Sequence, residues 1–147
     1  MPENIQLSYE KGNVLLDYVP NVLSWLICSN KVIDLLNKIN IIEIQCFPVE
    51  IFKKGIKEEP CLVTVVNVLE SVAAMDLEKS DYVSWEDDPK YIKFIRKIVL
   101  NSDASYKNLD MFRLEESKNY IIVSERIKEE VEKEGLRGFG FTLLEFA

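Results

Sequence analysis

Most apolar residues of the chain occur in short runs of strand length, either continuous or alternating with polar residues. Runs of this kind predict β-strands. The segments are 21–28, 42–52, 61–69, 91–100, 110–115, 120–123 and 139–146. Strands therefore outnumber helices, and we expect an α+β domain with a mostly antiparallel or mixed sheet and two or three packed helices.

A helix is expected directly after the first of these strands. Its apolar positions recur at spacings of three and four, and they are Val32, Leu35, Leu36 and Ile39. Such spacing places them on one helical face, which we expect to be well buried. Ser29 precedes the pattern as a typical N-cap, and Asn40 ends it.

A second helix follows Ser124 and carries only Ile127 and Val131 as strong apolar positions, so it should lie on the surface of a sheet. Gly135 comes next and is typical of a left-handed helix end. In that arrangement, a Schellman motif, Leu136 packs back on Val131.

Both predicted helices stand between two predicted strands, so the order strand, Ser-capped helix, strand occurs twice. The sequence leaves open whether this repeated unit arose by duplication or by convergence. Within 42–52, Pro48 is expected at a sheet edge or bulge because it lacks an N–H. The residues expected in the core are Leu26, Ile27, Leu35, Leu36, Ile44, Val63, Val65, Phe94, Ile122, Val131, Phe139 and Phe141, with Trp25 beside them.

The length and composition suit one domain over residues 1–147, because a chain of 147 residues with 48% hydrophobic content can bury a sufficient core without disulfides or metal. Histidine is absent, which excludes Ser-His-Asp and Cys-His catalysis. Cys28, Cys46 and Cys61 each lie in an apolar run and are expected to be reduced, buried thiols. No secretory leader or membrane span is visible, so we expect a cytoplasmic protein that uses no cofactor and no metal.

Charge is arranged in blocks along the chain. The formal net charge is -7, which argues against nucleic acid as a partner. Residues 70–88 contain seven acidic residues and one lysine, whereas residues 90–97 contain four basic residues and no acid. An acidic protein of this kind favours a basic partner.

Two features of the acidic block are candidates for chemistry. Asp76 and Glu78 are two residues apart and could hold a cation or act as an acid–base pair, but a solvated turn is the favoured interpretation. Trp85 is followed by three acids, which is the composition of a binding hot spot for a basic partner, with burial of the indole as the equal alternative. Arg96 and Arg113 do not define a site, because no glycine-rich loop accompanies them.

Three stretches, 67–82, 111–116 and 120–141, together resemble an immunity protein family of bacterial polymorphic toxin systems. The pattern is Asn before an apolar strand, Asp-x-Glu-x-Ser, Phe-Arg, and strand-Ser-helix-Gly-Leu-x-Gly-x-x-Phe. The matching residues are Asn67, Asp76, Glu78, Ser80, Phe112, Arg113, Ser124, Gly135, Leu136, Gly138 and Phe141. The resemblance spans about residues 21–146 and departs at Thr142 and Leu143, where family members often have a proline.

The resemblance implies a role but no active site. We therefore expect a non-catalytic immunity protein, monomeric or homodimeric, that binds and neutralises a cognate, basic toxin and binds neither nucleic acid nor membrane. The expected contact residues are Asp76, Glu78, Asp81, Trp85, Glu86, Asp87 and Asp88. The alternatives are a carboxylate- or metal-dependent hydrolase centred on Asp76 and Glu78, and a self-associating structural or adaptor domain.

Overall fold

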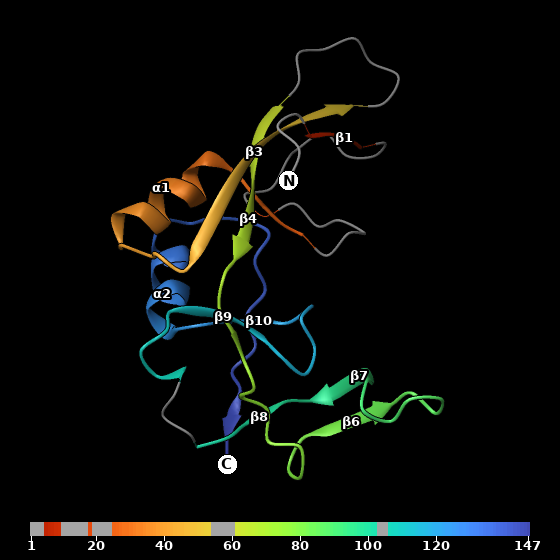
Figure 1. The fold of residues 1–147 in the computed structure, drawn as a ribbon. Coiled ribbons are helices and arrows are strands. Elements are labelled where there is room, and N and C mark those ends of the chain that lie inside the picture. Colours follow the sequence, from red (N-terminus) through yellow and green to blue (C-terminus); the bar gives the residue numbers. More distant parts are fainter. Residues whose placement is uncertain (1–4, 10–17, 19–24, 54–60, 103–105) are drawn as a thin grey trace.

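A computed structural model of the chain describes residues 5–9, 18, 25–53, 61–102 and 106–147 (Figure 1). The helices are α1 (Asn30–Lys38) and α2 (Glu125–Lys133). The strands are β1 (Ile5–Tyr9), β2 (Leu26–Cys28), β3 (Ile44–Lys53), β4 (Cys61–Val68), β5 (Ser71–Val72), β6 (Asp81–Ser84), β7 (Ile92–Lys97), β8 (Val99–Leu100), β9 (Met111–Leu114), β10 (Ile121–Val123) and β11 (Glu145–Phe146). The expected α+β class is confirmed.

The largest sheet has the strand order β1-β3-β4-β2. Its centre is the long antiparallel pair β3 and β4, whose register joins Ile44 to Val68 at one end. Strand β1 is parallel to β3 and pairs from Val49 onward. Within the part of the chain that the structure describes, Pro48 thus lies just outside the β1 ladder, at a local edge that tolerates its missing N–H.

The two faces of this sheet are packed differently, because alternate residues of each strand point to opposite sides. On one face, α1 packs on β2 and β4, and α2 packs against α1 (Figure 1). The buried residues of this layer include Cys28, Leu35, Leu36, Val66, Val68, Ile127 and Val131. The opposite face carries a separate apolar cluster made of Ile27, Val49, Ile51, Val63 and Val65, with Trp25 and Phe47 partly buried against it.

Both helices end in the same hydrogen-bonded cap. Asn40, with a φ of 59°, ends α1, and the Ile41 N–H donates to the Leu36 carbonyl at 2.9 Å. Gly135, with a φ of 66°, ends α2, and the Leu136 N–H donates to the Val131 carbonyl at 3.1 Å. These are the bonds of a Schellman motif. The predicted end of the second helix is confirmed, and α1 ends in the same way on an asparagine.

The lower half of the molecule in Figure 1 contains three small sheets with the orders β10-β9-β5, β11-β8 and β6-β7. Its core includes Ala74, Met75, Leu100, Phe112 and Leu114. The β6–β7 hairpin extends away from this core and projects from the side of the molecule (Figure 1). Neither described helix is long and apolar enough to cross a membrane.

Three sequence-based expectations are wrong. Residues 139–144 do not form a strand, and only Glu145–Phe146 pair with β8, so the second strand–helix unit lacks its expected third element. Phe139 instead stacks on Tyr18, with ring centroids 5.4 Å apart, and also lies 6.1 Å from Phe141. Phe94, expected in the core, is 43% exposed.

The third error concerns Cys46, which is exposed although its β3 position pairs with buried Val66 of β4. Cys28 is buried and free as expected, and the side chain of Cys61 lies outside the described residues. Six of the expected core residues are only partly buried: Trp25, Leu26, Ile44, Ile122, Phe139 and Phe141. Residues 21–24 of the first predicted strand also lie outside the described residues.

Candidate functional site

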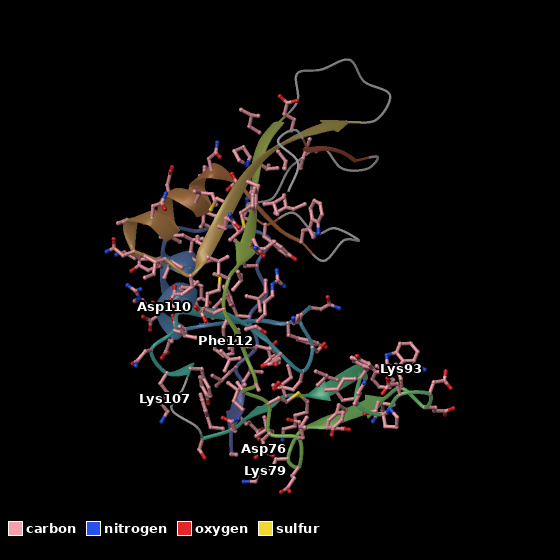
Figure 2. The ribbon with its side chains drawn as sticks, in the orientation of Figure 1. Asp76, Lys79, Lys93, Lys107, Asp110 and Phe112 are labelled. Atoms are coloured by element: carbon pink, nitrogen blue, oxygen red, sulfur yellow. The ribbon has the colours of Figure 1, made fainter. Side chains whose placement is uncertain are left out.

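The acidic segment begins with a turn that Asp76 holds together. Its Oδ1 accepts hydrogen bonds from the N–H groups of Glu78 and Lys79, both at 3.0 Å. An aspartate that bonds the backbone two and three residues ahead forms an Asx-type turn. Figure 2 shows Asp76 and Lys79 in this turn, at the end of the molecule. The turn interpretation of Asp76 is therefore confirmed.

Ser80 has a different structural role, because its hydroxyl bonds a distant strand. The Val99 N–H donates to Ser80 Oγ at 2.9 Å, and the Ser80 hydroxyl donates to the Val99 carbonyl at 3.2 Å. The Asp76 N–H also donates to that carbonyl, at 2.7 Å. Asp76 and Ser80 thus attach the acidic turn to β8.

The same residues give little support to metal or acid–base chemistry. The described part of the chain contains no group of three or more Cys, Asp or Glu side chains placed to hold a metal ion. Glu78 is exposed, and Asp76 already accepts two backbone hydrogen bonds. The geometry favours a turn that presents its acidic side chains to solvent.

The rest of the acidic block lies on the β6–β7 hairpin, together with the basic block that follows it in the sequence. The register joins Asp81 to Lys97 and Val83 to Phe94. Asp81 accepts a hydrogen bond from Arg96 Nη1 at 3.2 Å. Residues 81–97 contain four acidic and four basic residues, so this hairpin carries charges of both signs and no net charge.

Aromatic rings are exposed along this hairpin. Trp85 is 49% exposed, and Tyr91 is 58% exposed. Lys93 Nζ lies 5.1 Å from the centroid of the Trp85 ring, and Arg96 Cζ lies 5.2 Å from that of Phe94. Such cation–π contacts hold the exposed rings against neighbouring side chains. Figure 2 shows Lys93 on the hairpin, far from the labelled Asp110 beside α2.

The structure thus brings most of the predicted contact residues onto one projecting element. Trp85, Glu86, Asp87 and Asp88 follow β6, whereas Asp76 and Glu78 lie in the turn before it. The prediction did not include Tyr91 and Phe94, which belong to the same exposed surface. The available signal was their alternation with Lys90, Lys93 and Arg96 in the sequence.

A further polar cluster joins β9 to the start of α2. Asp110 Oδ1 accepts a hydrogen bond from the Ser124 hydroxyl at 2.7 Å, and Asp110 Oδ2 accepts one from Arg126 Nη2 at 2.7 Å. The Arg126 hydrogen bond is the main reason that the pKa of Asp110 lies below its ordinary value, and the Ser124 hydroxyl lowers it further. Ser124 makes no side-chain cap bond to its own helix. This cluster therefore orients α2 rather than forming a reactive site.

Comparison with known proteins gives one family. The family model described as "Immunity protein family (Imm11)" matches residues 1–145. No curated protein matches the chain.

Proposed function

The chain belongs to the Imm11 immunity protein family, and from this premise we propose that it binds and neutralises a cognate bacterial toxin without catalysing a reaction. The match covers nearly the whole chain, so the role applies to this domain as a unit. The proposal includes a cytoplasmic site of action, where the toxin of such a system would reach its target. Inhibition by binding needs a surface with anchoring side chains rather than an active site.

We place the toxin-binding surface on the β6–β7 hairpin and the turn before it. The observation that carries this assignment is Trp85, an indole 49% exposed on a projecting element and surrounded by charged side chains. Tryptophan is among the residues most enriched in binding hot spots. The contact residues are Asp76, Glu78, Asp81, Trp85, Glu86, Asp87 and Asp88.

The charges on this surface suit a partner that is basic where it meets the loop between β6 and β7. Glu86, Asp87 and Asp88 are consecutive there, and Asp88 forms an ion pair with Lys90 at 3.9 Å. Exposed acids attract a basic partner at long range and raise its association rate. The basic side chains of β7 then restrict how the partner can orient.

Co-expression tests the function, and charge reversal tests the surface. Cells that express the toxin encoded beside this gene should survive only when this chain is also produced. Replacing Glu86, Asp87 and Asp88 together by lysine should weaken toxin binding more than tenfold and reduce its salt dependence.

A matched control keeps the change in charge the same but moves it to the helices. Asp34, Glu125 and Glu129 are exposed on α1 and α2, so their replacement by lysine should leave binding nearly unchanged. Survival of toxin-expressing cells without this chain would overturn the function. Equal toxin affinities of the two triple variants would contradict only the assignment of the binding surface to the hairpin.

A further inference from the structure

A groove of about 390 Å³ lies on the face of the large sheet opposite the helices. Its lining is Trp25, Leu26, Gln45, Phe47, Val65, Val66, Asn67 and Arg113. The register explains this set, since Gln45 pairs with Asn67 and Phe47 pairs with Val65. One polar row and one apolar row therefore lie next to each other across β3 and β4.

Two partly buried aromatic side chains line the groove. Phe47 and Trp25 both pack against the cluster on this face of the sheet. Continuing the register of β2 with β4 by one residue places Trp25 opposite Asn67. Trp25 thus continues the row of Gln45 and Asn67. Phe47 lies in the neighbouring row, so an apolar side chain of a ligand would contact aromatic rings next to amide groups.

Arg113 contributes a positive charge at the polar side. Its Nη1 donates to the Lys118 carbonyl at 2.8 Å. Within the described residues, no carboxylate forms an ion pair with it, although it is partly buried. Burial lowers the pKa of its guanidinium from the ordinary value, yet arginine stays charged at neutral pH. A partly buried guanidinium with donors to spare can bind a carboxylate through two parallel hydrogen bonds.

Within the described residues, the side chains of Gln45 and Asn67 form no hydrogen bond to another part of the fold. Asn67 is exposed, and Gln45 is exposed beside it. By contrast, Asp76, Ser80 and Gly135 each have a clear role in a turn or helix end. The groove thus combines a cation and two exposed amides with two aromatic rings that also pack on the apolar cluster of this face.

We propose that this groove is a second binding site, which takes an extended, acidic segment of a partner protein, with a carboxylate on Arg113 and an apolar neighbour on Trp25 and Phe47. Charge complementarity selects the acidic segment, since an unpaired, partly buried cation gains most from an anion. This inference goes beyond the hairpin surface and does not rest on toxin neutralisation.

Short peptides test the site directly. The probe is acetyl-Leu-Glu-Leu-amide, and the matched control is acetyl-Leu-Gln-Leu-amide, which differs only in charge. Binding to the ¹⁵N-labelled full chain is followed by NMR, with dissociation constants expected in about the millimolar range for so small a ligand. The indole N–H of Trp25 should shift with the glutamate peptide, while that of Trp85 on the hairpin should not.

Two variants separate the groove from general charge effects. Gln45→Glu adds a carboxylate at an exposed position in the same groove as Arg113. It should weaken the binding of the glutamate peptide at least fivefold. Asn30→Asp adds the same charge on α1, away from the groove, and should change little. Arg113→Lys keeps the charge but loses the planar fork, so it should retain part of the affinity.

The outcomes are distinct from those of the toxin experiment. The proposed binding site is wrong if the glutamate peptide does not shift the indole N–H signal of Trp25, or if the two peptides bind equally well. Equal effects of Gln45→Glu and Asn30→Asp overturn the role of Arg113. A chain that gives no protection against a toxin but still binds the glutamate peptide through Arg113 keeps this inference intact.

Discussion

Ser80 and Val99 are joined by two hydrogen bonds through one hydroxyl group, which accepts from the Val99 N–H at 2.9 Å and donates to the Val99 carbonyl at 3.2 Å. Val99 is 3% exposed, so neither of its backbone groups can easily be satisfied by water instead. This connection fixes the acidic turn to β8 and determines where the β6–β7 hairpin leaves the domain.

Removing the Ser80 hydroxyl should lower the stability of the fold without changing any of the proposed toxin contacts. Ser80→Ala leaves the buried Val99 N–H without its acceptor, so the free energy of unfolding should fall by about 1–2 kcal/mol. Urea denaturation measures the change. The matched control is Ser84→Ala, because Ser84 is a partly buried serine of β6. This substitution should change the free energy of unfolding by less than about 0.5 kcal/mol. Equal effects would mean that the Ser80 bonds add nothing.

The Asp110 carboxylate should make stability depend on pH on the acid side. Its pKa is below the ordinary value of 3.8 in the folded chain, chiefly because Arg126 donates to it. The resulting stabilisation is present above the unfolded-state pKa and is lost as the pH falls through the folded-state pKa.

Asp110→Asn should therefore lower the free energy of unfolding at pH 7 by about 1 kcal/mol, with the difference from wild type shrinking below about pH 4. Thermal unfolding across pH measures this. Asn37→Ala, on the exposed face of α1, removes no titratable group and should give the same small effect at every pH. A pH-independent loss in Asp110→Asn would show that packing, not charge, is responsible.

Two glycines near the end of α2 offer a test of backbone strain without steric change. A Cβ at Gly135 or at Gly140 would meet no atom within 4 Å, but only Gly135 has a left-handed φ, of 66°. Gly135→Ala should destabilise by about 1 kcal/mol, because an L-residue is strained there. Gly140→Ala should be neutral or slightly stabilising. Chemical denaturation of both variants checks the contrast, and equal values would exclude strain as the cause.

Local features of the fold could be predicted from the sequence because a few neighbouring residues determine them. The end of α2 depends on Gly135 and Leu136, and both helices start after the predicted serines, Ser29 and Ser124. The serine at the start of α2 nevertheless bonds Asp110 rather than its own helix. The place of Ser124 in the sequence predicted where α2 starts. The group that its hydroxyl bonds depends on the tertiary structure and could not be predicted.

Features that depend on pairing between distant segments could not be predicted in this way. The acidic block and the basic block are consecutive in the sequence, but only the antiparallel register of β6 and β7 places Asp81 against Arg96 and Lys97. The predicted strand over 139–146 shows the same limit. Gly138 has a φ of 97°, and Phe139 stacks on Tyr18, so aromatic packing replaces strand pairing in most of this segment.

The candidate contact surface was predicted in part, because composition identifies an aromatic residue among acids but not its exposure. Trp85 could equally have been buried, and its 49% exposure shows that the indole is not enclosed in the core. Arg113 was recognised only as an isolated arginine. Its position near Gln45 and Asn67 depends on the packing of β9 beside β3 and β4, from which β9 is distant in the sequence.

The hairpin assignment makes a last prediction about Trp85 itself. Trp85→Ala removes an indole that lies outside the buried clusters, so the thermal midpoint should change little, while toxin affinity should fall more than tenfold. Leu143→Ala is the control, because Leu143 is 96% exposed and lies outside the hairpin. Calorimetric titration with the cognate toxin measures both. If Trp85→Ala binds the toxin as tightly as Leu143→Ala, the binding surface lies elsewhere, because a hot-spot indole cannot be lost without cost.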